Sequence, residues 1–373
     1  MNKVCLSSHN TWSIYNFRLN LIKKLINAGK EVHIYSPVDD YSDNLSELGC
    51  IVHKANFIGR SKNLFKEAFA LINWIIFLKR NSFEICFHFG IKPNIYGSIA
   101  AIINNVQYVN NITGLGDIFI KKNILQLFVK NLYLFTQKKA KKVFFQNKDD
   151  LKVFLESKII SNNSNYDLLP GSGVDLERFK QKNYDINKKN KISFYFVGRL
   201  LKSKGAELFI QAAKKIKDEN KFKNIEFFMV GFFEKNASKD GVSQKFLDES
   251  EDAGIIKYLG RSDHMEETLL KADCVVLPSS YREGTPRSLL EACAMGIPII
   301  TTNSVGCKNV VEHNFNGFMI KPNCVDDLKL SIENFVLLTQ EERIKMGIMA
   351  RKKVELEFDE NIVIDKYMEL LND

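Results

Sequence analysis

Two cations in the second half of the sequence have the spacing of an anion-binding site. Arg199 follows an apolar, strand-like run, and Lys204 lies five residues further on, where a helical pattern begins. The amino end of a helix attracts anions, arginine adds a planar pair of donors, and lysine adds a mobile point charge. The segment therefore predicts a phosphate site. The alternative is that both cations are solvated surface residues.

Two carboxylates, Glu283 and Glu291, have seven residues between them, the first in a predicted loop and the second in the helix that follows. The amino end of that helix could take a diphosphate against Gly284 and Thr285. A carboxylate beside a phosphate repels it, unless the carboxylate accepts hydrogen bonds from nearby hydroxyl groups. We therefore expect Glu291 to bind a ribose diol and Glu283 a sugar hydroxyl. Helix capping and exposure to solvent are the alternatives.

Glycine ends three apolar runs of this half, at Gly198, Gly231 and Gly260. A residue without a side chain lets a ligand ring or another backbone segment approach closely. Arg261 follows the third glycine and repeats the glycine–arginine pair found at Gly198. We therefore predict that Gly198, Gly231 and Arg261 line the same binding site.

Strand-like and helical patterns alternate along the whole chain and must position these residues. Strands are expected at 3–7, 31–36, 50–53, 85–89, 107–112, 143–145, 192–197, 225–230, 256–259, 274–277 and 298–301. This alternation predicts parallel sheets with helices on both faces. Because 373 residues exceed one ordinary core, we expect an α/β protein of two Rossmann-like domains facing across a central cleft. Ligands would bind there, at the carboxyl ends of the strands.

A turn-rich and polar stretch divides the two halves. We predict a first domain over 1–175, a linker over 176–190 and a second domain over 191–355. A C-terminal helix over 356–373 could cross back to the first domain.

The composition excludes several classes of protein. With 45% hydrophobic and 26% charged residues, the chain is expected to be globular rather than disordered. Its seven cysteines are scattered singly, so neither a metal site nor a disulfide framework is predicted. The start of the chain lacks the pattern of a signal peptide, and the apolar run 68–78 is too short to span a bilayer. A cytoplasmic location is therefore expected.

The net charge of +9 lies entirely in the first half, since residues 1–175 carry 22 Lys and Arg and 13 Asp and Glu. Within it, segments 61–80 and 121–142 mix aromatic and basic residues, as helices on an anionic membrane surface do. Ordinary core helices with solvated lysines are the alternative. Nucleic acid is not an expected partner, because no nucleic-acid-binding module is recognised.

The order of these motifs resembles that of a known enzyme family. In the second half the motifs are Gly198-Arg199 with Lys204-Gly205, the Glu-x7-Glu stretch 283–291, the segment 296–300, and Gly306, Glu312 and Asn316-Gly317. In the first half they are the segments 12–18, 91–97 and 111–116. Together they resemble the retaining glycosyltransferases of family 4, which have the GT-B fold. The first-half segments are similar to the branch that builds lipid-linked bacterial surface glycans.

This resemblance implies a reaction and its substrates. The second domain would hold a nucleotide-diphosphate sugar, with UDP as the expected nucleotide, and the first would bind the acceptor. Arg199 and Lys204 would neutralise the leaving diphosphate, Glu291 would bind the ribose and Glu283 the donor sugar. A hexose or N-acetylhexosamine would pass, with retention, to a lipid-linked glycan of surface polysaccharide such as O-antigen. The family needs no metal and no cofactor. Its members of this branch work at the inner face of the cytoplasmic membrane.

The sequence departs from the family at two places in the first half. Segment 8–13 stands where many relatives have a glycine-rich loop, and Thr113 stands where many have a histidine. The expected acceptor-side residues are Ser13, His88, Lys92, Asn94, Thr113 and Gly114. Two other functions remain open: a sugar-nucleotide 2-epimerase of the same fold, and a non-catalytic nucleotide-sugar-binding subunit.

Overall fold

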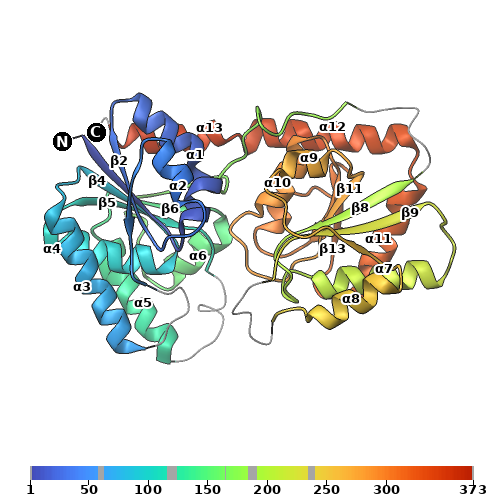
Figure 1. The fold of residues 1–373 in the computed structure, drawn as a ribbon, viewed down its shortest axis with the longest axis horizontal. Coiled ribbons are helices and arrows are strands. Elements are labelled where there is room, and N and C mark those ends of the chain that lie inside the picture. The colour runs from blue at the N-terminus through green and yellow to red at the C-terminus, as the bar shows by residue number, and fades with distance from the viewer. Residues whose placement is uncertain are drawn as a thin grey trace. The chain divides into compact units, whose positions relative to one another are not determined.

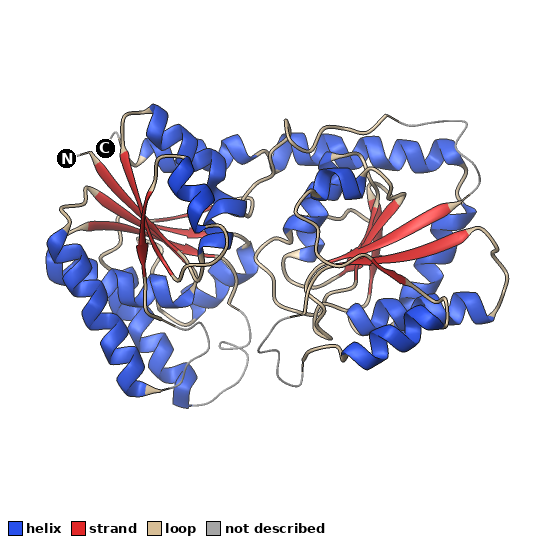
Figure 2. Ribbon diagram, in the orientation of Figure 1, coloured by secondary structure: helices blue, strands red, loops and turns tan. Residues whose placement is uncertain are grey.

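A computed structural model describes residues 2–57, 63–115, 124–163, 165–183, 191–233 and 240–371. The chain forms two compact units. Unit 1 comprises Met1–Ser172 and Asn361–Asp373, and unit 2 comprises Gly173–Glu360. Each unit has its own parallel sheet with helices on both faces (Figure 2). The predicted α/β fold of two Rossmann-like domains is therefore confirmed.

The sheet of unit 1 has seven strands in the order β3-β2-β1-β4-β5-β6-β7 (Figure 1). Every strand pairs in parallel with its neighbours, for example Val4 opposite Val32 on one side and Ile85 on the other. The strands are β1 Lys3–Ser7, β2 Glu31–Ser36, β3 Ile51–Lys54, β4 Ile85–Phe89, β5 Gln107–Ile112, β6 Lys142–Phe145 and β7 Tyr166–Leu168.

Alternating side chains of these strands face two helical layers. In β4, Ile85 and Phe87 pack in the core beneath α1 and α13, whereas Cys86 packs in the core beneath α3 and α4. The helices are α1 Thr11–Asn27, α2 Ser42–Glu47, α3 Leu64–Arg80, the π-helix η1 Pro93–Gly97, α4 Ser98–Asn104, α5 Ile124–Gln137, α6 Lys148–Glu156 and α13 Glu360–Glu369. Such two-sided burial makes each strand a near-continuous apolar run.

The sheet of unit 2 has six parallel strands in the order β10-β9-β8-β11-β12-β13. They are β8 Ile192–Val197, β9 Ile225–Val230, β10 Lys257–Tyr258, β11 Cys274–Leu277, β12 Ile299–Thr302 and β13 Gly317–Ile320. The helices are α7 Ala206–Asp218, α8 Gln244–Asp252, α9 Met265–Leu269, α10 Arg287–Ala294, the short 3₁₀ turn η3 Cys307–Asn309, α11 Val325–Leu337 and α12 Gln340–Glu357.

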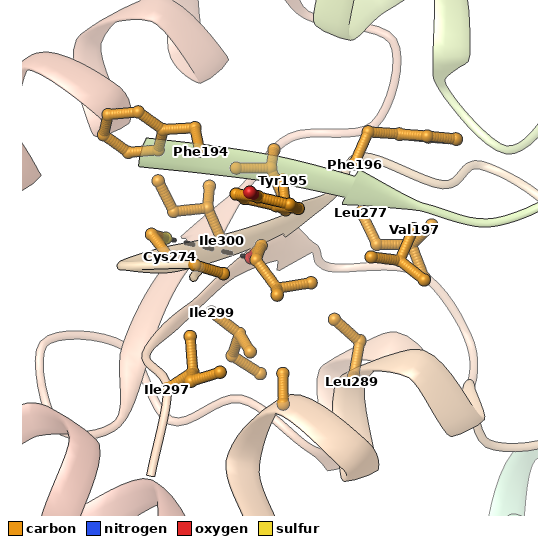
Figure 3. Close-up of a cluster of buried hydrophobic side chains, with 14 of the residues drawn as sticks. Phe194, Tyr195, Phe196, Val197, Cys274, Leu277, Leu289, Ile297, Ile299 and Ile300 are labelled. Carbon is orange, nitrogen blue, oxygen red and sulfur yellow. Dashed lines mark hydrogen bonds between the residues drawn. The ribbon is translucent and has the colours of Figure 1, made fainter. Parts of the chain in front are cut away.

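The core of unit 2 forms where β8, β11 and β12 meet the helices. Figure 3 shows Val197 and Leu277 on neighbouring strands near Leu289 of α10, with Ile299 beside them. All four side chains are almost fully buried. Since α10 carries Glu291 on its other side, this packing fixes the helix that positions that carboxylate.

The linker predicted over 176–190 does not separate the units, because its described part is bound to unit 2. Phe179 is buried there, and the N–H of Lys182 donates to the carbonyl oxygen of Met295 at 3.1 Å. The chain instead passes from one unit to the other at 172–173 and at 360–361. Residues 184–190 lie outside the described residues.

The C-terminal tail divides between the units. Met346, Ala350 and Val354 of α12 belong to the core of unit 2. Tyr367, on α13, belongs to the core of unit 1. Of the helix expected over 356–373, residues 356 and 357 end α12, a break follows near Phe358, and α13 forms the helical part beyond it.

Candidate active site

The predicted donor-side residues follow the two central strands of the unit 2 sheet. β8 and β11 are neighbours although β9 and β10 come between them in the chain, so the strand order changes direction at this point. Open α/β sheets bind ligands at such a point, outside the carboxyl ends of the strands. Arg199 and Lys204 follow β8, and Glu283 follows β11.

Hydrogen bonds join the loop after β8 to the loop after β11. The carbonyl oxygen of Ser203 accepts from the N–H groups of Ser280 and Tyr281, at 2.8 and 3.0 Å. Asp240 holds Ser203 in turn, because its carboxylate accepts from the N–H and the hydroxyl of Ser203, at 2.9 and 2.6 Å. The loop that carries Glu283 is therefore attached to the residue that precedes Lys204.

Lys204 and Glu283 meet between these loops. The ammonium of Lys204 donates to Oε1 of Glu283, and the hydroxyl of Ser279 donates to the same oxygen at 3.2 Å. Only 13% of the lysine side chain and 11% of the glutamate side chain are exposed. The ring of Tyr281 lies 5.4 Å from Lys204 Nζ. A ligand that contacts either charged group is therefore within reach of the other.

Two glycines permit this close packing. A Cβ at Gly205, where φ is +80°, would lie 2.3 Å from the carbonyl oxygen of Pro278. A Cβ at Gly306, where φ is +87°, would lie 2.6 Å from the carbonyl oxygen of Gly284 and 2.8 Å from Cβ of Glu283. A side chain at either position would push apart the loops that carry Lys204 and Glu283.

The glycine-ended strands pack their carboxyl ends against one another. The N–H of Gly231 donates to the carbonyl oxygen of Gly260 at 2.9 Å, and a Cβ at Gly231 would lie 1.8 Å from the carbonyl oxygen of Gly198. The backbone packing alone therefore requires glycine at 231. Arg261 follows β10, the edge strand, and forms a 3.1 Å ion pair with Asp263. It lies two strands away from β8.

Glu291 lies on the second turn of α10 and pairs with Arg287 one turn earlier. Arg287 Nε donates to Glu291 Oε1 at 3.1 Å, and both side chains are largely buried. Burial raises the pKa of the Glu291 carboxyl above its ordinary value, while the positive charge of Arg287 opposes that rise. Gly284 and Thr285 come just before the helix. The carboxylate and the amino end of α10 therefore belong to one short segment.

The structure thus joins the predicted residues by different kinds of contact. Lys204 and Glu283 touch, Gly198 and Gly231 pack together, and Arg199 lies half-buried in the same loop as Lys204.

In unit 1, His88 is the last residue but one of β4 and is fully buried. Ser7 Oγ lies 2.7 Å from His88 Nδ1. A Cβ at Gly97 would lie 2.4 Å from the ring, so η1 packs directly on the imidazole. Burial lowers the pKa of His88 to about 3. The ring is therefore neutral near pH 7, and its position is fixed by Ser7 and Gly97.

Asn94 of η1 lies against the end of β5. Its Nδ2 donates to the carbonyl oxygen of Asn111 at 2.8 Å. The Oδ1 atoms of both asparagines are buried and accept no hydrogen bond from the part of the chain that is described. Since buried polar atoms are almost always paired, these two oxygens are suited to accept from a hydroxyl group.

Two further acceptor-side candidates are held by neighbouring side chains. Ser13 Oγ lies 2.7 Å from Ser8 Oγ at the start of α1. Lys92 forms a 2.7 Å ion pair with Glu67, and neither side chain is well exposed. Contacts within unit 1 therefore already engage both candidates.

The last two candidates lie in the loop after β5. Thr113 is exposed, and Gly114 has a φ of +126°, which favours glycine. Gly116, which completes this family-like segment, lies outside the described residues.

Three polar residues of the site were not predicted from the sequence. Arg287 had a readable signal, because it precedes Glu291 by four residues on a helix, the spacing of an ion pair. Ser279 stands in the loop before Glu283. Asp240 had no local signal, since only the fold brings it to Ser203.

Two further features are absent from the described ranges of the chain. No three or more His, Cys, Asp and Glu side chains gather there in a way that could hold a metal ion. No helix there has both the length and the apolar content needed to cross a membrane.

Two family models match the chain and together account for most of it. Residues 177–353 match the model of glycosyl transferases group 1, and residues 3–147 match the glycosyl transferase 4-like model. The chain is a glycosyltransferase. Its two units have the two Rossmann-like domains of the GT-B fold.

Two curated relatives of this glycosyltransferase are named for transfer to sugars linked to diphospho-undecaprenol. It is 29% identical to N,N'-diacetylbacillosaminyl-diphospho-undecaprenol alpha-1,3-N-acetylgalactosaminyltransferase of Campylobacter jejuni, over 97% of this chain and 96% of the relative. It is 28% identical to UDP-Gal:alpha-D-GlcNAc-diphosphoundecaprenol alpha-1,3-galactosyltransferase of Escherichia coli, over 84% of this chain and 81% of the relative. The glycosyltransferase is therefore similar to hexosyl- and N-acetylhexosaminyltransferases.

Solved structures show the same fold. A glycosyltransferase from Rickettsia africae superposes with a TM-score of 0.78 at 20% identity, over 99% of this chain and 97% of that one. The Anabaena protein HepE in complex with UDP superposes with a TM-score of 0.79 at 17% identity, over the full length of both chains.

Proposed function

We propose that this glycosyltransferase moves a hexose or N-acetylhexosamine, with retention, from a UDP-sugar to a polyprenyl-diphosphate-linked glycan of a surface polysaccharide. The observation that carries the proposal is the contact of Lys204 with Glu283 where the strand order of unit 2 changes direction. A cation for a phosphate and a carboxylate for a sugar hydroxyl are what a sugar diphosphate needs at adjacent positions.

The charged groups of unit 2 support the following position for the donor, which is part of the proposal. Its diphosphate lies against Arg199, Lys204 and the amino end of α10. Glu283 accepts from a hydroxyl of the transferred sugar. Glu291, held by Arg287, accepts from the ribose hydroxyls. The chain's own cations thus supply the positive charge beside the diphosphate, and we propose transfer without a metal ion or a cofactor.

Relatives support the identity of both substrates. The name of the Escherichia coli relative gives UDP-Gal as its donor, and HepE was solved with UDP. Both curated relatives described above carry diphospho-undecaprenol in the name of their acceptor. We therefore propose UDP as the nucleotide and a lipid-linked diphosphate glycan as the acceptor.

The reaction breaks the bond between the anomeric carbon and the diphosphate oxygen and forms a bond to an acceptor oxygen. Charge develops on the leaving diphosphate, where Arg199 and Lys204 stabilise it. The acceptor hydroxyl attacks from the face that the diphosphate leaves, so the anomeric configuration is retained. Its proton passes to a phosphate oxygen of the leaving group. This step therefore does not require His88, whose ring is neutral and buried, to act as a general base.

A lipid-linked acceptor places the enzyme at a membrane. We propose that it works as a peripheral protein at the inner face of the cytoplasmic membrane. The positive charge of residues 1–175 supports contact with anionic lipid headgroups there.

Single substitutions test the assigned cations. Arg199→Ala and Lys204→Ala should each lower kcat for transfer by about 10²–10³-fold, because each removes stabilisation of the leaving diphosphate. Lys202→Ala is the matched control, since Lys202 is half exposed and pairs with Glu207 at 3.2 Å. The measurement is release of UDP from UDP-GalNAc and UDP-Gal with a polyprenyl-diphosphate glycan acceptor.

Three results of this assay would overturn the proposal. Near-normal transfer by either alanine variant would remove the role of that cation. Release of UDP with an epimerised free sugar, and no need for acceptor, would indicate a 2-epimerase. Binding of UDP-sugars without turnover would indicate a non-catalytic subunit.

A further inference from the structure

The exposed face of α3 is apolar, which is unusual for a helix on the surface of a soluble unit. Phe65, Phe69, Ile72 and Ile76 are 89%, 58%, 53% and 41% exposed. At 3.6 residues per turn these four positions form one stripe about 60° wide. Exposed apolar residues are normal when scattered singly, whereas a continuous stripe marks an interaction surface.

The stripe is not the core face of the helix. Ala70, Trp74, Phe77 and Leu78 are buried beneath α3 and lie on the side opposite the stripe. These buried residues hold the helix on the sheet. The exposed stripe is therefore available to something outside the unit.

α5 repeats the arrangement. Leu127, Phe128 and Phe135 are 60%, 57% and 50% exposed, while Val129 and Tyr133 are buried on the other side of the helix. Four of the five exposed phenylalanines among the described residues lie on α3 and α5. Aromatic side chains of this kind are typical of the boundary between lipid headgroups and acyl chains.

Both helices belong to one layer of unit 1. α3 and α5 each pack against η1, and Figure 1 shows them running along the same side of the sheet. Because the sheet lies beneath both helices, their exposed stripes face outward from the same side of the unit.

Cations border the two stripes, and exposed carboxylates are missing from the described parts of both helices. Lys66, Lys79 and Arg80 are exposed on α3, whose single acidic residue, Glu67, is paired with Lys92. Residues 124–142 contain no Asp or Glu, and the exposed residues that follow the apolar part of α5 are Lys138 and Lys139. Between residues 51 and 148 the sequence has 15 Lys and Arg and three Asp and Glu.

We propose that α3 and α5 form one membrane-docking surface, whose apolar stripes enter the headgroup boundary of an anionic bilayer while the bordering cations bind lipid phosphates. This proposal extends the proposed function and rests on it, because the membrane in question is the one that holds the lipid-linked acceptor. Binding combines buried apolar area with electrostatic attraction, so neither alone accounts for it.

The charges favour a bilayer over a second copy of the chain. Two copies that met through this surface would bring like cations together, with no exposed carboxylate of α3 or of the described part of α5 to pair with them. Like charges across an interface cost affinity. Anionic lipid headgroups instead offer the opposite charge along the whole surface.

Sedimentation with vesicles tests the surface. The full chain is mixed with vesicles of phosphatidylcholine containing about 30% phosphatidylglycerol, without acceptor or donor. Phe65→Ser/Phe69→Ser/Ile72→Ser should reduce binding about tenfold or more at both low and high salt, because it removes apolar area that enters the membrane. Lys66→Gln/Lys79→Gln/Arg80→Gln should reduce binding mainly at low salt, where attraction between charges is strongest.

The matched control removes exposed apolar residues from unit 2. Leu330→Ser/Leu337→Ser/Leu356→Ser should bind the vesicles as the wild type does, because these leucines are exposed but lie outside the surface. All substituted positions are exposed, so each variant should fold. Circular dichroism of each variant checks this.

Three results would overturn the inference: a wild-type chain that stays in the supernatant at low salt, a serine variant of α3 that sediments as well as the wild type, and an equal loss in the unit 2 control. A wild-type dimer that the α3 variant converts to a monomer, without vesicle binding, would assign the surface to a second copy.

The assay separates this inference from the proposed reaction. Vesicle binding that is lost only in the α3 variants supports the surface even if no sugar is transferred. Transfer to an acceptor in detergent, by a chain that does not bind vesicles, would keep the reaction and remove the surface.

Discussion

Glu291 shows how one buried carboxylate can be set for a hydroxyl-bearing ligand. Burial destabilises its charged form, and Arg287 restores part of the balance from one helical turn away. Because this carboxylate is buried, it has little bound water to lose when a ligand's hydroxyl groups bind to it. Its hydrogen bonds to a ribose are then charge-assisted, which makes them stronger than those between neutral groups.

Replacing this carboxylate should weaken donor binding in a pH-dependent way. Glu291→Gln should raise the Kd for the UDP-sugar about 10- to 100-fold, because the charge-assisted hydrogen bonds are lost. The raised pKa of Glu291 means that its carboxylate begins to take up a proton above the usual glutamate range. Donor affinity of the wild type should therefore fall as the pH is lowered through that pKa. The measurement is calorimetric titration from pH 8 to pH 5.

Comparison of variants isolates the effect of Glu291 from the titration of the ligand itself. The Glu291→Gln chain should show a shallower pH dependence than the wild type. Glu249→Gln is the control, because Glu249 is exposed on α8 and should leave the affinity unchanged. An unchanged Kd in Glu291→Gln at pH 8 would remove Glu291 from the donor site.

For single residues, the sequence predicts which residue types belong to the site better than it predicts which residues contact one another. Glycine before Arg199 and a carboxylate on the second turn of α10 could be read directly from local patterns. The contact of Lys204 with Glu283 joins residues 79 apart in the chain, so no local pattern encodes it. The link from Asp240 to Ser203 is hidden for the same reason.

Among the elements, the loops after β8 and β11 act as a pair because glycine lets them pack. Gly306 lies against Gly284 and Glu283 and has a φ of +87°. Gly254 also has a positive φ, of +66°, but nothing lies within 4 Å of its would-be Cβ. Both glycines have a positive φ, although Gly306 also has a ψ of −51°, and they differ in their surroundings.

Alanine at these two glycines should separate packing from backbone strain. Gly254→Ala should cost about 1 kcal/mol of unfolding free energy, from its left-handed backbone alone. Gly306→Ala should cost about 1–3 kcal/mol more, because its Cβ forces the 283–284 loop to move. It should also lower kcat/KM, since Glu283 moves with the loop. Urea unfolding and initial rates measure the two effects, and equal losses in both variants would contradict the packing argument.

Strands of both sheets were predicted well where they are buried on two faces, because such strands read as compact apolar runs. β1, β2, β4, β5, β8, β9 and β11 have the predicted bounds. β7 and β13 were missed, since both are short strands at the end of a sheet. The π-helix η1, which packs on His88 and precedes α4, could not be told from α-helix by the spacing of its residues.

For the whole molecule, apolar periodicity predicted helices in the C-terminal tail but left their packing open. The tail divides because α12 buries Ala350 and Val354 in unit 2, whereas α13 buries Val363 and Tyr367 in unit 1. An amphipathic helix can cover either of two similar sheets. Which sheet the helix covers depends on the shape of the surface against which it packs, and that shape exists only in the folded unit.

Tyr367 should therefore control the stability of unit 1 from the far end of the chain. Its ring is fully buried, 5.1 Å from the rings of both Phe87 and Phe144, and its hydroxyl accepts from Asn111 Nδ2 at 2.5 Å. Tyr367→Ala should cost about 3–5 kcal/mol of unfolding free energy, because it leaves a cavity between the sheet and α13. Tyr367→Phe, the matched control, should cost about 1 kcal/mol, because it loses one hydrogen bond.

The chain itself supplies the probe for this measurement. Its two tryptophans, Trp12 and Trp74, both lie in unit 1, so tryptophan fluorescence in urea reports on that unit. Hydrogen exchange by mass spectrometry follows unit 2 in the same samples. Because the two cores are separate, Tyr367→Ala should lower the fluorescence midpoint and leave protection of β8 and β11 nearly unchanged. A fluorescence midpoint equal to that of the wild type would mean that α13 does not stabilise unit 1, and that the core of this unit is complete without the last residues of the chain.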